Sequence, residues 1–216
     1  MSLTLHFHPL SSFCHKVLIA LYENDTAFTP KLVNLQDEGE RAAFHALWPV
    51  GKFPVLQDDV RGRMVPESSI IIEYLDQHYP GKTRFIPADV EEARGVRFRD
   101  RFFDLHIHLH MQKIVGDRLR PLGAKDPHGV EDARTRMAAA LGIVEEEMTG
   151  RTWAAGNILT MADCAAAPAL FYADKVAPFA GTYPSLIAYL DRLKQRPSYA
   201  RTLQEAEPYF KFFPKE

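Results

Sequence analysis

Ser11 and Cys14 stand three residues apart in the segment Pro9-Leu10-Ser11-Ser12-Phe13-Cys14. This S-x-x-C spacing is the redox pattern C-x-x-C with its first sulfur replaced by a hydroxyl. In a C-x-x-C turn the first position is exposed at a helix start, where an anion is stabilised, and the second is shielded within the first turn. We therefore expect Ser11 to hold the reactive position and to donate its O–H to a thiolate carried by a ligand. The alternative is that Ser11 and Ser12 only cap the helix and form the turn.

Lys52-Phe53-Pro54-Val55-Leu56 is a second segment suited to binding, since a proline enters an apolar strand there. Pro54 has no N–H for strand pairing, and a proline in such a position is often cis. A cis Pro54 leaves the N–H and C=O of Phe53 available to pair with an extended, peptide-like ligand. Lys52 is then placed to meet a carboxylate. Taken singly, these residues also fit an ordinary edge-strand proline preceded by a solvated lysine.

Pro66-Glu67-Ser68-Ser69 opens an amphipathic helix whose apolar face we expect to point inward. A carboxylate bound at Ser68 gains from its hydroxyl and from the helix dipole, and Glu67 is suited to an ammonium group. The simpler interpretation is that Ser68 caps the helix and that Glu67 is a favourable acid in its first turn.

The elements that position these residues alternate between strand and helix over the first eighty residues. Leu3–Phe7 alternates as a strand does, and apolar residues recur at helical spacing over Phe13–Leu21. Further elements follow at residues 28–35 (a strand that Pro30 confines to a sheet edge), 38–47 (a helix), 53–65 (a hairpin) and from 66 (a helix). The order β-α-β-α-β-β-α predicts an α/β domain of thioredoxin-like layout over residues 1–80.

Strand patterns end at the connection that contains Pro80, Gly81 and Pro87, and we interpret residues 81–89 as a linker. Residues 90–216 predict an all-α C-terminal domain. Its first helix spans Val90 to about Leu119, with apolar residues at four-three-four spacing. These residues are Phe98, Phe102, Leu105 and Leu109.

Thr160 and Asp163 form a capping box that predicts the start of a buried helix, in which Cys164 is a core residue. Four aromatic residues crowd the tail at 207–214, too many to remain solvated. We expect this tail to fold over the second domain and to cover part of a cleft.

Composition argues against several classes of function. Charged residues make up 25% of the chain and the formal net charge is -2, which gives no footprint for nucleic acid or an anionic membrane. The sequence has no leader-like start and no apolar stretch long enough to cross a bilayer. Cys14 and Cys164 are too few for a disulfide framework and are typical of a reducing compartment. We expect a cytoplasmic protein with no nucleic-acid or membrane partner.

His106 and His110 lie four residues apart and share one face of the predicted helix, a spacing that also occurs in metal sites. The pair lacks a third ligand in the sequence nearby, so we reject a metal site as the main hypothesis. The favoured interpretation is that both line a surface or a cleft, where they can contact a second substrate.

Three segments, in their order and spacing, resemble the glutathione-binding segments of the glutathione transferase superfamily. They are Pro9-Leu10-Ser11-Ser12, residues 50–56 and residues 67–71. The helical half adds patterns similar to W-x-x-G and S/T-x-A-D at residues 153–156 and 160–163. The resemblance covers nearly the whole chain. Within the superfamily the chain looks like a bacterial, serine-type member similar to the theta and zeta classes.

The resemblance implies that glutathione is the co-substrate, that no metal is needed, and that Ser11 is the catalytic residue that stabilises the thiolate. In such an arrangement the backbone of Phe53 pairs with the cysteinyl unit and Lys52 approaches the glycyl carboxylate. The start of the helix near residue 67 holds the γ-glutamyl end. The implied glutathione-binding residues are Ser12, Lys52, Phe53, Pro54, Glu67 and Ser68.

The same resemblance implies a second site for a small hydrophobic electrophile, lined by Leu10, His106 and His110. It further implies a homodimer with a role in detoxification.

Three alternatives stay open at this point. Cys14 could carry out thiol transfer or reduction, because thiolates are favoured near a helix start. A zeta-like isomerase is the second alternative, although that class carries S-S-C where this chain has Phe13 in the third position. The third is a non-catalytic module that binds glutathione only as a ligand.

Overall fold

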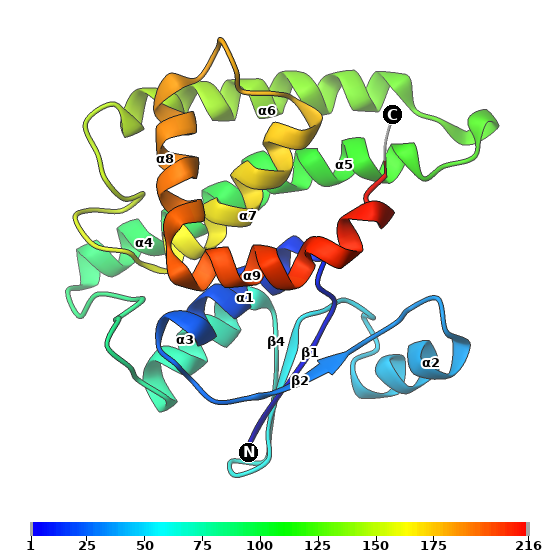
Figure 1. Ribbon diagram of the computed structural model, residues 1–216, viewed down its shortest axis with the longest axis vertical. Helices are drawn as coiled ribbons and strands as arrows, with labels where there is room; N and C mark the ends of the chain where they lie inside the picture. The colour runs from blue at the N-terminus through cyan, green and yellow to red at the C-terminus, as the bar shows by residue number, and fades with distance from the viewer. Residues whose placement is uncertain (1, 215–216) are drawn as a thin grey trace. The chain divides into compact units, whose positions relative to one another are not determined.

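Residues 2–214 are described in the computed structural model, where they form two compact units (Figure 1). The first unit contains the residues up to Ile86 together with Pro197–Phe210. The second contains Pro87–Arg196 together with the residues from Lys211.

The first unit is built on one mixed sheet with the strand order β2-β1-β3-β4. Its strands are β1 (Leu3–Phe7), β2 (Thr29–Leu32), β3 (Val55–Asp58) and β4 (Arg63–Pro66). β1 pairs in parallel with β2 and antiparallel with β3, and β3 pairs antiparallel with β4. Pro30 lies on β2 at the edge of the sheet, which confirms the expectation for this proline.

Helices cover both faces of this sheet. They are α1 (Ser12–Glu23), α2 (Glu38–Leu47) and α3 (Ser68–His78), and α9 (Pro197–Ala206) packs against α1. Val55 packs with Phe44 of α2, and side chains alternate along a strand, so Leu56 faces the opposite side. Leu5 and Val65 pair with Leu56 in register and are buried with it. Figure 1 shows α2 set apart from α1 and α3, with the strands between them. The predicted thioredoxin-like layout is confirmed.

The bend that leads into β3 depends on a glycine and a proline. The Phe53–Pro54 peptide bond is cis, as expected from the proline at the strand entry. Gly51 has φ 66, and a Cβ placed on it would lie 2.1 Å from Cε1 of His45. Glycine is therefore favoured at this turn by its backbone conformation, and a larger residue would also displace the His45 ring.

The second unit is all-α, as predicted. It contains α4 (Val90–Phe102), a π-helical segment (Phe103–His108), α5 (Leu109–Arg118), α6 (Pro127–Met148), α7 (Met161–Val176) and α8 (Pro184–Gln195). Short 3-10 turns occupy Leu122–Ala124 and Glu207–Phe212. The predicted helix from Val90 to about Leu119 is thus continuous, with π-helical geometry in its middle. None of the helices within residues 2–214 combines the length and the apolar character needed to span a bilayer.

Helix α7 is the centre of the second unit, since nearly all of its residues are buried and it packs against α4, α5 and α8. The predicted capping box is present at its start. The buried carboxylate of Asp163 accepts hydrogen bonds from the N–H groups of Thr160 and Ala154, at 2.8 and 2.9 Å. It also accepts from the hydroxyl of Tyr189 at 2.6 Å. Cys164 is fully buried, as expected for a core residue.

The apolar residues at four-three-four spacing in α4 and α5 are mostly not in the core. Phe102 is buried, but Phe98, Leu105 and Leu109 are 57%, 39% and 53% exposed. The buried face of these helices is formed instead by other apolar residues, among them Val96, Phe103, Ile107, Met111 and Ile114. The spacing therefore marks an exposed apolar stripe on the second unit.

Helix α9 packs against α1 in the first unit, whereas the sequence assigned residues 90–216 to the all-α domain. Ser198 donates a hydrogen bond to Glu23 at 2.8 Å, and Tyr22 donates one to Glu205 at 2.5 Å. Residues 197–210 thus pack within the first unit, although they follow the helices of the second unit in the sequence. The functional boundaries at 1–80, 81–89 and 90–216 stay predictions.

Candidate functional site

Three segments of the first unit meet at one end of its sheet. β1 ends at Phe7, and the chain continues to Ser11. β3 begins at Val55, directly after the cis peptide bond, and Val55 pairs with His6 near that end of β1. Pro66, the last residue of β4, pairs with Val55 in turn, and the chain then continues into α3. The register therefore brings the segments of Ser11, Phe53 and Ser68 to the same end.

Side-chain contacts tie these segments together. The ring of His8, just after β1, stacks on the ring of Phe53 with centroids 6.1 Å apart. Lys16 in α1 is 1% exposed, and its Nζ donates to the hydroxyl of Ser69 at 2.8 Å. The starts of α1 and α3 are thus fixed to each other through a buried lysine.

Ser11 occupies the N-cap position of α1, with φ −77° and ψ 117°. Its Oγ accepts a long hydrogen bond of 3.4 Å from the N–H of Cys14. That bond uses a lone pair of the oxygen, and the O–H of Ser11 remains a donor that in this structure serves the sulfur of Cys14 and would have to turn to a ligand thiolate. The capping role and the proposed donor role are therefore compatible in one half-buried side chain.

Two histidines, not singled out from the sequence, hold the turn that presents Ser11. The Nδ1 of His8 accepts from the N–H of Leu10 at 3.2 Å. His15 is fully buried, and its Nε2–H donates to the carbonyl of Pro9 at 2.5 Å. Burial lowers the pKa of His15 to about 4, so its ring is neutral near pH 7. The sequence clue was the position of His15, four residues after Ser11 and on the same helical face.

Cys14 lies on the buried side of the same turn. It is fully buried, and burial raises the pKa of its thiol to about 12, outweighing hydrogen bonds from Ser11 and the His8 backbone. A thiol with such a pKa is almost wholly protonated near neutral pH, and thiolate chemistry is suppressed. This agrees with the shielded position expected for the second residue of the motif.

We expect the folded protein to show almost no thiol reactivity. Cys14 and Cys164 are both buried and free, so a thiol reagent should label roughly none of them in the native state and both in denaturant. Intact mass after timed labelling measures this directly. Rapid native labelling of Cys14 would show that its side chain is accessible and would return thiol transfer to consideration.

Just before β3, Phe53 offers backbone groups and Lys52 offers a positive charge to a ligand. Phe53 is half-buried and packs on Phe44 with ring centroids 6.0 Å apart, which fixes the backbone before Pro54. Pro54 is buried, whereas Lys52 is exposed. Lys52 is thus able to reach an anionic group, and the cis bond sets the backbone direction of Phe53.

The start of α3 differs from the simpler sequence interpretation. Glu67, and not Ser68, occupies the N-cap position, and its side chain makes no capping hydrogen bond. Glu67 also has φ 69°, a strained conformation for a residue with a side chain, and such strain gathers at functional sites. Ser68 is the first residue of the helix and is 6% exposed. The N–H groups of this first turn receive no cap from Glu67, which suits them to a carboxylate.

The remaining predicted residues are placed as follows. Ser12 is buried as the first residue of α1, and Leu10 is half-buried in the turn before it. In the second unit, His106 is exposed with its ring 5.1 Å from that of Phe102, and His110 is half-buried. Burial and the nearby charge of Arg136 lower the pKa of His110. A role for these histidines in a substrate cleft stays a prediction.

The aromatic tail contributes a residue that was not singled out. Tyr209 packs edge-on against His8, with ring centroids 5.5 Å apart. It thereby adds a third ring to the pair of His8 and Phe53. In the second unit, Phe213 stacks on Tyr172 of α7 at 5.6 Å, whereas Phe212 is 66% exposed. Residues up to Phe210 belong to the first unit, so the expectation that the whole tail folds over the second domain was wrong for that part.

Comparisons with known proteins agree with this arrangement. The family description "Glutathione S-transferase, N-terminal domain" matches residues 5–83, and "Glutathione S-transferase, C-terminal domain" matches residues 102–197. A probable maleylacetoacetate isomerase of Vibrio cholerae is 29% identical over 215 residues, covering 96% of this chain and 98% of that protein. FtsZ-localized protein A of Caulobacter vibrioides is 29% identical over 213 residues, covering 95% and 92%.

A similar solved structure is a glutathione S-transferase from Methylobacillus flagellatus, crystallised with glutathione bound. It has a TM-score of 0.85 and 25% sequence identity, and the match covers 93% of this chain and 98% of that one. The two family descriptions together match most of the chain, and the solved structure matches nearly all of it. The chain therefore belongs to the glutathione S-transferase superfamily of enzymes.

Proposed function

We propose that the chain binds glutathione at the end of the sheet near Ser11 and conjugates it to a small hydrophobic electrophile. The observation that carries this proposal is the placement of Ser11 at the N-cap of α1, where its Oγ accepts from the N–H of Cys14 and its O–H can turn from the Cys14 sulfur to the thiolate of a ligand. A hydrogen bond and the positive end of a helix dipole both favour a thiolate over a thiol. Ser11 thus supplies the activation of the nucleophile, and no metal is required for that step.

The charges around Ser11 support glutathione as the ligand. Glutathione carries two carboxylates and one ammonium group, and this end of the sheet offers Lys52, the start of α3 and Glu67. The backbone of Phe53 lies just before β3, next to the cis Pro54, and can pair with the cysteinyl unit. Ser12 and Ser68 are largely buried, so their part in the site is to shape the two helix starts.

Titration calorimetry with glutathione tests the binding part of the proposal. We expect saturable binding by the wild-type chain, and binding weakened by roughly tenfold in Lys52→Ala, because a charge-assisted contact to a carboxylate is lost. Lys31→Ala is the matched control, since Lys31 is an exposed lysine on the edge strand β2. No heat with glutathione, or equal weakening in both variants, would contradict the proposal.

Two other functions are kept as alternatives because specific relatives favour them. The Vibrio relative is named as an isomerase, and the Caulobacter relative is named for its localisation and not for a reaction. Maleylacetoacetate as substrate in the presence of glutathione tests the first. Glutathione binding without turnover of any member of a broad electrophile panel would favour a binding module. Thiol transfer at Cys14 is disfavoured by the burial and raised pKa of that thiol.

We further propose a cytoplasmic homodimer that acts in detoxification. The exposed apolar stripe of Phe98, Leu105 and Leu109 supports the dimer, because a contiguous apolar surface of this kind is typical of an interface. Two free cysteines, both buried as thiols, support a reducing compartment.

Charge introduced on the stripe should separate the subunits. Phe98→Glu combined with Leu105→Glu is expected to shift the species in solution from a dimer toward the 24.5 kDa monomer, since both residues are exposed in the isolated chain and an unpaired charge opposes association. Sedimentation velocity measures the change. Leu122→Glu, at a residue 90% exposed elsewhere in the same unit, is the control and should leave the dimer intact. An unchanged dimer in the double variant would place the interface on another surface.

A further inference from the structure

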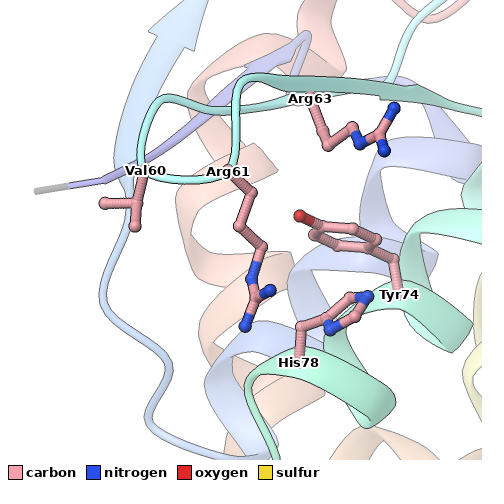
Figure 2. A pocket seen from close by; sticks show the side chains of 5 residues that line it. All are labelled: Val60, Arg61, Arg63, Tyr74 and His78. Atoms are coloured by element: carbon pink, nitrogen blue, oxygen red, sulfur yellow. The ribbon is translucent and has the colours of Figure 1, made fainter.

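The first unit has a hollow of about 520 Å³ at the opposite end of the sheet from Ser11. It is lined by Val60, Arg61, Arg63, Tyr74 and His78 (Figure 2). In the register, Asp58 pairs with Leu3 and Arg63 at the start of β1, three residues away from the pairing of Val55 with His6. Three residues of a strand span about 10 Å, so this hollow is separate from the candidate glutathione site.

The carboxylate of Asp58 lies buried beside the hollow, and its hydrogen-bonding capacity is used within the fold. The side chain of Asp58 is fully buried and accepts hydrogen bonds from the hydroxyls of Tyr74 and Tyr79, at 2.7 and 2.5 Å. It also accepts from the N–H groups of Val60 and Arg61, both at 3.1 Å. Burial by itself raises the pKa of Asp58, but these hydrogen bonds outweigh it and hold the pKa below its ordinary value. The carboxylate is therefore ionised, and its lone pairs are taken by the fold.

The surface of the hollow carries positive charge. Nε of Arg61 forms an ion pair with Asp58 at 3.8 Å, its guanidinium lies over the ring of Tyr79 at 6.0 Å, and the side chain is 46% exposed. Arg63 is exposed at the start of β4. Figure 2 shows the two arginine side chains extending from the hairpin on either side of Tyr74, with His78 below. Two guanidinium groups thus line one hollow, and that of Arg61 is partly neutralised by the buried Asp58.

The walls of the hollow are rigid. The rings of Tyr74 and His78 contact each other edge to face, with centroids 4.6 Å apart, on successive turns of α3. The hydroxyl of Tyr74 is held by Asp58, which also fixes the hairpin turn through its bonds to backbone N–H groups. Helix and hairpin are therefore held to each other, so the backbone positions from which Arg61 and Arg63 extend are fixed.

We propose that this hollow is a binding site for a phosphate group, held by the guanidinium groups of Arg61 and Arg63 with the ring of His78 at its side. Arginine presents N–H donors in a planar fork that matches phosphate oxygens, and two such forks hold one tetrahedral anion from two directions. A bound dianion also relieves the repulsion between the two like charges. The phosphate is either free or the terminal group of a small molecule, whose remainder meets Val60 and Tyr74.

The test measures binding of inorganic phosphate and of phenyl phosphate to the full chain by calorimetry, with chloride at matched ionic strength as the baseline, because salt screens exposed charges. We expect saturable binding that is weakened by roughly tenfold or more in Arg63→Ala and partly restored in Arg63→Lys. Arg63 is the residue of choice, since Arg61 also lies beside the buried Asp58 and its loss disturbs the hairpin. Lys31→Ala removes the same charge at the opposite sheet edge and should bind as the wild type does.

The outcomes separate cleanly. Tighter binding of phenyl phosphate than of inorganic phosphate identifies a phosphorylated small molecule as the ligand, and equal binding identifies free phosphate. Absence of saturable binding, equal affinity in Arg63→Ala and wild type, or displacement of phosphate by glutathione would each overturn the proposal. The last result would place the anion at the Ser11 end of the sheet.

Discussion

Ser11→Ala is expected to lower kcat for conjugation by roughly 10²- to 10³-fold, the loss seen when one preorganised donor to a developing anion is removed. The affinity for glutathione should change little, because the proposed site binds the ends of glutathione through Lys52, Glu67 and the start of α3. The pKa of the bound glutathione thiol should rise toward its value in free solution, since the hydroxyl that favours the thiolate is gone. Ultraviolet absorbance of the thiolate as a function of pH, together with kcat and calorimetry, measures all three quantities.

A second variant separates catalysis from capping. Ser11 also caps α1, so Ser11→Ala should lower the free energy of unfolding by about 1 kcal/mol. Ser11→Asp keeps an N-cap acceptor, restores that stability, and has no proton to donate when ionised. We expect it to be as stable as the wild type and at least as inactive as Ser11→Ala. Full activity in Ser11→Ala, with glutathione still bound, would exclude the catalytic role of Ser11.

Local patterns in the sequence were enough to predict the elements and several details of the site. The alternation in Leu3–Phe7, the cap at Ser11 and the proline after Phe53 each depend on neighbours a few residues away. Such features follow from backbone geometry and hydrogen bonding within a turn. The box of Thr160 and Asp163 belongs to the same class.

Features that depend on packing between distant segments could not be predicted. Periodicity in α4 and α5 marked an apolar face, but nothing in the sequence told whether Phe98 and Leu105 met a core or remained exposed. The contact of Ser198 with Glu23 joins residues 175 positions apart, so the return of α9 to the first unit has no local pattern. The rings of His8 and Tyr209 meet for the same reason.

The positive φ of Glu67 shows a second limit of prediction from sequence. A sequence indicates a positive φ when glycine or asparagine stands at the position, and glutamate gives no such indication. The strain at Glu67 is sustained by the flanking structure: β4 is held in register by β3 up to Pro66, and α3 begins at Ser68. The direction of the first turn of α3, and hence its suitability for a carboxylate, therefore emerges only in the folded unit.

Asp163→Ala is expected to lower the free energy of unfolding of the second unit by roughly 3–5 kcal/mol. The carboxylate is fully buried and receives donors from Ala154, Thr160 and Tyr189. Removing it leaves buried N–H and O–H groups without an acceptor, and each of these costs about 1–3 kcal/mol. A loss of this size is a large fraction of the 5–15 kcal/mol that typically stabilises a protein, so the variant should be poorly folded at elevated temperature.

Urea denaturation followed by the fluorescence of the tryptophans, of which Trp153 is the neighbour of Ala154, measures the effect. Asp191→Ala is the matched control, because that carboxylate is 55% exposed in a pair with Lys194 and should change stability by less than about 0.5 kcal/mol. Burial raises the pKa of Asp163, so its charge opposes folding at neutral pH and its contribution there comes from accepting hydrogen bonds. Asp163→Asn keeps one acceptor oxygen and should therefore fall between the wild type and Asp163→Ala. An Asp163→Ala protein within about 1 kcal/mol of the wild type would show that another group satisfies those donors.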